Sequence, residues 1–109
     1  AQDPSGGLEL QKTDGSWIAA PYVPGTFVIN IGDLMARWTN GLYQSNKHQV
    51  VNRTGKERFS IPFFFNPDHR AVVECIPNCN QLDNADCYPP VMAGEYIANK
   101  IRTNQGFKD

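Results

Sequence analysis

The sequence predicts an all-β chain, a sandwich or barrel, with one short helix near its C-terminal end. Its apolar residues fall into short runs that are rich in β-branched and aromatic side chains. Nine glycines and eight prolines among 109 residues supply turns between these runs. Many short strands joined by such turns are typical of sandwiches and barrels.

The first predicted elements form a hairpin. Residues 8–11 alternate apolar and polar side chains, as a half-buried strand does, and residues 13–16 have the composition of a tight turn. This turn returns the chain into a second strand at residues 17–18. After a break at residues 21–25, the apolar run at residues 26–31 is too short for a helix and predicts a buried strand.

The remaining elements are also short. Residues 34–38 have a pattern that fits either a strand or one helical turn. Residues 48–51 predict another strand, and a polar turn separates it from a longer strand at residues 58–65. Further along, residues 71–75 predict one more strand and residues 94–102 have the spacing of a helix.

The longest predicted strand has two different faces, because successive side chains of a strand point to opposite sides. One face carries Arg58, Ser60, Pro62 and Phe64, and the other carries Phe59, Ile61, Phe63 and Phe65. We expect the second face to lie in the scaffold core. We expect the first face to line a pocket, with Phe64 as part of the substrate-pocket wall.

Charge and hydropathy exclude two kinds of partner. The net charge is −1 and the isoelectric point is about 6.1, whereas nucleic acid and anionic membranes call for clustered Lys and Arg. The longest apolar stretches, residues 26–31 and 61–65, are far shorter than the ~20 residues that span a bilayer. We therefore expect neither a nucleic-acid nor a membrane partner.

Three cysteines, Cys75, Cys79 and Cys87, lie in the C-terminal third. Their odd number argues against a complete disulfide framework, and their spacing does not match the paired Cys-x-x-Cys of a structural zinc site. We expect reduced thiols in a cytoplasmic protein.

The residues with the clearest chemistry are His48 and, ten positions later, Arg58 followed by Ser60. A neutral imidazole is a common ligand of first-row metals, and an arginine beside a hydroxyl is a planar clamp for a carboxylate. A lone histidine on a strand is more often structural, and a lone arginine more often makes a surface ion pair. Together, however, the three residues predict half of an active site, with iron beside an anionic cosubstrate.

The surrounding motifs strengthen this prediction. In order, they are Gly6-Gly7-Leu8-Glu9-Leu10, Gly15-Ser16-Trp17, residues 23–33, Thr39-Asn40-Gly41-Leu42-Tyr43-Gln44-Ser45, His48 and Arg58-Phe59-Ser60. In this order and spacing they resemble the isopenicillin N synthase-like group of non-haem iron(II), 2-oxoglutarate-dependent oxygenases. The resemblance covers roughly residues 1–70, and residues 88–96 are similar to the closing helix of bacterial and fungal members.

The resemblance implies a jelly roll, or double-stranded β-helix, of which this chain supplies a part, and it favours a strand at residues 34–38. It implies that His48 ligates Fe(II). Arg58 would bind the distal carboxylate of 2-oxoglutarate through both oxygens, and Ser60 would be the second donor. The reaction would use O2 to hydroxylate, desaturate or cyclise a small organic substrate. A subset that includes isopenicillin N synthase itself holds a substrate carboxylate with the same two residues and needs no 2-oxoglutarate.

The resemblance also shows which ligands this sequence lacks. The family binds iron with two histidines and a carboxylate, and the first two ligands come from a His-x-Asp upstream of the Gly-Gly-Leu segment. No His-x-Asp occurs here, and His69 follows Asp68 in the wrong order. We therefore expect a C-terminal segment of a longer enzyme, inactive alone, whose partner is the missing N-terminal part. Residues 1–75 would belong to the dioxygenase domain, and residues 76–109 would form a loop and helix extension.

Two other classes of protein remain open, the first because His-x-Asp is absent and the second because the edges of a partial sheet would be exposed. One is a non-catalytic jelly-roll binding module, or a degenerate oxygenase domain without metal. The other is a structural fragment that completes a sheet contributed by another chain.

One position departs from the family pattern. The family usually has arginine after the ligand histidine, and this sequence has Gln49. Because Gln49 faces away from the side that His48 occupies, we expect the change to alter local salt bridging rather than iron binding.

Overall fold

The computed structural model describes residues 1–79 and 88–105 and divides into two compact units. The first unit comprises residues 1–30 and 45–64, and the second comprises residues 31–44 and 65–109. Among the residues described, no helix has the length and apolar character that crossing a membrane requires.

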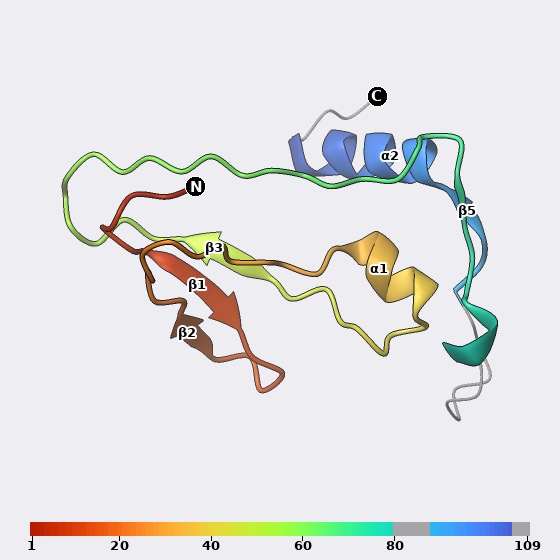
Figure 1. The fold of residues 1–109 in the computed structure, drawn as a ribbon, viewed down its shortest axis with the longest axis horizontal. Helices are drawn as coiled ribbons and strands as arrows, with labels where there is room; N and C mark the ends of the chain where they lie inside the picture. Colours follow the sequence, from red (N-terminus) through yellow and green to blue (C-terminus); the bar gives the residue numbers. More distant parts are fainter. Residues whose placement is uncertain (80–87, 106–109) are drawn as a thin grey trace. The chain divides into compact units, whose positions relative to one another are not determined.

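A three-stranded antiparallel sheet forms the centre of the first unit (Figure 1). β1 (Leu8–Gln11) lies between β2 (Trp17–Ala19) and β3 (His48–Val50). The turn between β1 and β2 is closed by the amide of Lys12, which donates to the carbonyl of Ser16 at 2.8 Å. The predicted hairpin and the strand predicted at the position of β3 are confirmed.

The register of this sheet sorts its side chains into two faces. Leu10 pairs with Ile18 of β2 and with His48 of β3, so these three side chains share one face. The neighbouring residue Glu9 pairs with Gln49, and both point to the opposite face. His48 therefore lies on an apolar face of the sheet, and Gln49 lies on the face that carries Glu9.

The first residues of the chain pair with the segment that follows Arg58. The amide of Asp3 donates to the carbonyl of Phe59 at 3.1 Å, and the amide of Ile61 donates to the carbonyl of Ala1 at 2.7 Å. The carboxylate of Asp3 also accepts a bond from the Phe59 amide at 2.6 Å. These bonds give the segment after Arg58 an extended neighbour.

The prediction of a buried strand at residues 26–31 is wrong. The run is irregular, and the side chains of Phe27 and Ile29 are 85% and 82% exposed. A strand requires a neighbour that takes up its hydrogen bonds and covers its side chains. Neither sheet formed by the described residues includes this run. Although its residues favour extended backbone, no neighbouring strand takes up their hydrogen bonds.

The predicted strand at residues 58–65 forms only at Ser60, which makes an isolated bridge to Gln2. The prediction that one face of this run lies in a scaffold core is also wrong. The exposed fractions of that face are 69% for Phe59, 73% for Ile61, 87% for Phe63 and 92% for Phe65. The cause is the same, because the described residues supply no layer that covers this face.

In the second unit, the strand that the family resemblance favours at residues 34–38 is wrong. The segment forms α1 (Asp33–Trp38), a helix of 6 residues. So short a run has too few apolar positions for periodicity to decide its structure, and its C-terminal cap decides instead. Asn40 takes left-handed backbone with φ of +49°, which lets the amide of Gly41 reach the carbonyl of Ala36 at 2.8 Å.

The rest of the second unit is a strand pair followed by a longer helix. β4 (Val72–Val73) pairs antiparallel with β5 (Val91–Met92), and β5 continues directly into α2 (Ala93–Gln105) (Figure 1). A single 3-10 turn, η1 (Pro77–Cys79), follows β4. Val73 and Ala93 are fully buried and form the core of this unit. The strand and helix predicted in this region are confirmed, although β4 is shorter than expected.

Charged and aromatic side chains tie α1 to α2. The ammonium of Lys100 lies 2.9 Å from the carboxylate of Asp33, and the hydroxyl of Tyr96 donates to the same carboxylate at 3.2 Å. The guanidinium of Arg37 lies 5.1 and 5.2 Å from the ring centres of Tyr88 and Tyr96, within cation–π range. Partial burial and the Asp33 charge raise the pKa of Tyr96.

The all-β prediction is therefore confirmed only in part. Most of the observed strands lie where the sequence predicts a strand. However, α1 and α2, of 6 and 13 residues, add more helix than the one short C-terminal helix that was predicted.

A substitution at Gly7 tests the close approach of the chain to β3. Gly7 has φ of +85°, and an added Cβ would lie 2.7 Å from the Val51 carbonyl oxygen. Gly15 has φ of +84° but open space around it, so Gly15→Ala is the matched control. We expect Gly15→Ala to lower the free energy of unfolding by about 1 kcal/mol. Gly7→Ala should lower it by about 2 kcal/mol or more, because strain and overlap combine. Chemical unfolding measures both, and equal losses would contradict the close approach.

The titration of Asp3 tests the pairing of the N-terminal residues. Hydrogen bonds from the Ser5 hydroxyl and the Phe59 amide lower the pKa of Asp3. Because the folded pKa is depressed, the stabilisation is fully present above the ordinary pKa and is lost as the pH falls through the folded value. The NMR shift of the Phe59 amide should follow this low-pH titration.

In Asp3→Asn the same amide shift should no longer follow that titration. Asp14→Asn is the control, because among the described residues Asp14 accepts its bonds only from nearby Ser16. If the Phe59 amide titrates alike in wild type and Asp3→Asn, the bond to Asp3 is not the cause.

Candidate functional site

His48 begins β3 on the apolar face of the sheet. Its Nδ1 lies 3.2 Å from the carbonyl oxygen of Asn46, and the residue is exposed. A tautomer with the proton on Nδ1 donates to this carbonyl and leaves the lone pair on Nε2. Metal-binding histidines commonly have their second nitrogen held in this way. The ring is thus arranged to ligate through Nε2.

The side chains of Arg58 and Ser60 lie together, as the alternation expected for residues 58–65 predicts. The Nη1 of Arg58 donates to the hydroxyl oxygen of Ser60 at 3.2 Å. The Nε of Arg58 donates to the Gly6 carbonyl at 2.5 Å, and its Nη2 donates to the side-chain oxygen of Gln2 at 3.4 Å. Arg58 is half-buried and held at both ends of its guanidinium, while Ser60 is exposed beside it.

One short segment of the chain positions both the histidine strand and the arginine. The Gly7 carbonyl accepts a bond from the Val51 amide at 2.8 Å, which continues the β1–β3 pairing. The preceding carbonyl, that of Gly6, holds Arg58. The Gly6-Gly7 pair therefore binds both the end of the His48 strand and the side chain of Arg58.

On the face opposite His48, Glu9 forms a network that sequence reasoning missed. The Nη2 of Arg53 lies 2.7 Å from one carboxylate oxygen of Glu9, and the Nε2 of Gln49 donates to the other at 2.9 Å. The bonds from Arg53 and Gln49 lower the pKa of Glu9. The cation that pairs with Glu9 comes from Arg53, in the turn after β3.

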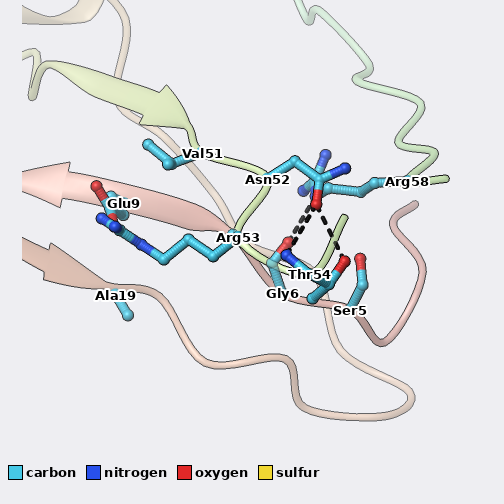
Figure 2. Close-up of a pocket in the computed structure, with 10 residues that line it drawn as sticks. Ser5, Gly6, Glu9, Ala19, Val51, Asn52, Arg53, Thr54 and Arg58 are labelled. Atoms are coloured by element: carbon cyan, nitrogen blue, oxygen red, sulfur yellow. Dashed lines mark hydrogen bonds and ion pairs between the residues drawn. The ribbon is translucent and has the colours of Figure 1, made fainter. Parts of the chain in front are cut away.

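A small hollow of about 160 Å³ lies next to this network. Figure 2 shows Glu9 and Arg53 at one end of it, and Arg58, Asn52 and Thr54 at the other. Of the predicted site residues, only Arg58 lines this hollow.

Phe64 is not brought to an enclosed position. It is 77% exposed, so the described residues do not form the pocket wall expected around it.

The described residues contain no complete set of metal ligands. Within residues 1–79 and 88–105, no three side chains of His, Cys, Asp or Glu gather closely enough to hold a metal. Cys79 is a free thiol, and Cys87 lies outside the described residues. The imidazole of His48, with its Nδ1 at the Asn46 carbonyl, fits the role of a single iron ligand.

Comparison with known proteins gives the family. The model of the 2OG-Fe(II) oxygenase superfamily matches residues 1–67. A 2-oxoglutarate-Fe(II) type oxidoreductase of Emericella nidulans is 42% identical over 108 residues, which cover 96% of this chain and 30% of the relative. Homoarginine-6-hydroxylase of Oryza sativa subsp. japonica is 40% identical over 98 residues, which cover 89% of this chain and 30% of the relative.

Solved structures agree with this assignment. A full-length Neurospora crassa protein in complex with alpha-KG matches with a TM-score of 0.82 and 34% identity, over 92% of this chain and 32% of that protein. The dioxygenase for auxin oxidation in rice matches with a TM-score of 0.77 and 27% identity, over 96% of this chain and 36% of that protein. The chain spans about a third of the length of the relatives it matches. The chain belongs to the 2OG-Fe(II) oxygenase superfamily, the oxidoreductases that use Fe(II) and 2-oxoglutarate.

Proposed function

We propose that the protein carrying this chain is an Fe(II)- and 2-oxoglutarate-dependent oxygenase that oxidises a small organic substrate. In this proposal the chain supplies the distal iron ligand, His48, and the carboxylate clamp, Arg58 with Ser60. The observation that carries the proposal is the contact between Arg58 and Ser60, at 3.2 Å, on the run that follows the His48 strand.

The geometry of Arg58 suits a carboxylate. Its Nε is engaged by the Gly6 carbonyl, which fixes the plane of the guanidinium and orients the terminal nitrogens. The hydroxyl of Ser60 lies beside one of those nitrogens. A carboxylate bound there would receive charge-assisted bonds from Arg58 and a further bond from Ser60.

His48 would bind iron from the apolar face of the sheet. Leu10 and Ile18 share that face. Bound Fe(II), together with 2-oxoglutarate and O2, supplies the oxidising chemistry. The chain's own residues bind and orient, because His48 places the metal and Arg58 with Ser60 places the cosubstrate.

The remaining ligands and the covering layers would come from an N-terminal part of the same protein. The chain spans about a third of its relatives, and the exposed side chains of Phe27, Ile29 and Phe63 lack a cover among the described residues. We propose that this part brings the His-x-Asp, completes the jelly roll, and closes the substrate pocket against Phe64.

The names of relatives support a small organic molecule as the substrate. Relatives are named for homoarginine, 1-aminocyclopropane-1-carboxylate and auxin, which are all small organic molecules. The chain is similar to each over the same region, so the region supports a common chemistry rather than one substrate.

Anaerobic titration tests the proposal. Adding Fe(II) and 2-oxoglutarate to the protein that carries this chain should produce the weak visible charge-transfer band of chelated 2-oxoglutarate. His48→Ala should abolish the band, because the metal loses a ligand. Arg58→Ala should raise the 2-oxoglutarate concentration needed by about 10- to 100-fold, and Ser60→Ala by about two- to tenfold.

His69→Ala is the matched control for His48→Ala, because both histidines are exposed and His69 lies outside the proposed site. Its band should equal that of wild type. Iron binding that survives His48→Ala would contradict the assignment of His48 as an iron ligand. Iron binding without the band, in wild type, would instead indicate an oxidase that does not use 2-oxoglutarate.

A further inference from the structure

Glu9 is the charged side chain of the sheet that the fold encloses most. Its residue is 9% exposed, although it is an ionisable group at the middle of a strand. Both carboxylate oxygens have partners, and these partners, Gln49 and Arg53, are 40 and 44 residues away in sequence. A carboxylate that is removed from water requires such partners.

The side-chain bond between Glu9 and Gln49 depends on the register of β3 against β1. Glu9 lies opposite Gln49, and the next pair along is Leu10 opposite His48. A slip of one residue in β3 would move His48 to the other face of the sheet. β3 has only three residues, so few backbone bonds oppose such a slip. A side-chain bond that forms only in the correct register is therefore important here.

Arg53 secures the turn between His48 and Arg58, five residues from each. Asn52 shapes this turn by donating to the Lys56 carbonyl at 2.7 Å and accepting from the Thr54 amide at 3.1 Å. The ion pair of Arg53 with Glu9, at 2.7 Å, ties the shaped turn back to β1. The turn thus has its own structure and a single charged attachment to β1 among the contacts described.

We propose that Glu9, held by Gln49 and Arg53, is a positioning residue that keeps His48 on the metal-binding face. The inference rests on the proposed function, since it takes His48 as the iron ligand. Glu9 lies on the opposite face and does not touch the metal, so it acts through the register of β3.

The experiment measures two quantities in the protein that carries this chain. The first is the affinity for Fe(II) in the presence of 2-oxoglutarate, under anaerobic conditions. The second is the protection of the Gln49 and Val51 amides, which face β1, from hydrogen exchange in the metal-free protein. Arg53→Ala should weaken Fe(II) binding by about two- to fivefold, the range that an ion pair with one exposed partner can contribute to the correct register. The same variant should lose amide protection at both positions.

Gln49→Arg in the Arg53→Ala background is the rescue. An arginine at position 49 lies opposite Glu9 and can donate to its carboxylate, so both Fe(II) affinity and amide protection should return. Glu9→Gln should weaken Fe(II) binding as Arg53→Ala does, and Gln49→Arg should not rescue it, because the negative charge is gone.

Arg70→Ala is the matched control. Arg70 is 75% exposed, as Arg53 is 71% exposed, and it pairs with Asp68 at 3.3 Å outside the sheet. It should leave Fe(II) affinity unchanged.

The outcomes separate the two levels of the proposal. If wild type binds Fe(II) through His48 but Arg53→Ala and Glu9→Gln bind it equally well, the positioning role is overturned and the function stands. If wild type binds no Fe(II), or His48→Ala binds it unchanged, the function and the positioning role are both overturned.

Discussion

The backbone pairing of β1 is the constraint on which the first unit depends. β1 takes up hydrogen bonds from β2 on one edge and from β3 on the other, and it leaves no edge free for a different partner. The two residues before it, Gly6 and Gly7, accept hydrogen bonds from Arg58 and from the residue that follows β3. Residues that are far apart in sequence thereby acquire fixed positions relative to one template strand.

Sequence reasoning succeeded where a local signal and its partner lie close together. The β1–β2 hairpin needs only a turn between two alternating runs, and α2 has enough turns for its periodicity to show. At α1 the pattern left a strand and a helical turn open and the family resemblance favoured the strand, whereas the segment is a helix that is followed by the left-handed Asn40. Sequence reasoning failed for residues 26–31 because a strand's partner cannot be read from the strand's own composition.

The candidate site was predictable to a similar degree. The contact between Arg58 and Ser60 follows from alternation on one run, so two residues of sequence were enough. The ion pair of Glu9 with Arg53 was not predictable, because it depends on the register of β3 and on the path of the turn that follows. Gln49 was the signal that could have prompted a search for another cation near Glu9.

The exposed aromatic run after Arg58 has a consequence for the solubility of this chain. Residues 59–65 combine aromatic and β-branched side chains without a charge, which is the composition of segments that assemble into intermolecular sheets. Pro62 stands in the middle of the run and has no amide hydrogen to donate. A second copy aligned along this run would meet a missing bond at its centre. Pro62 therefore disfavours the pairing of two copies of the chain along this run.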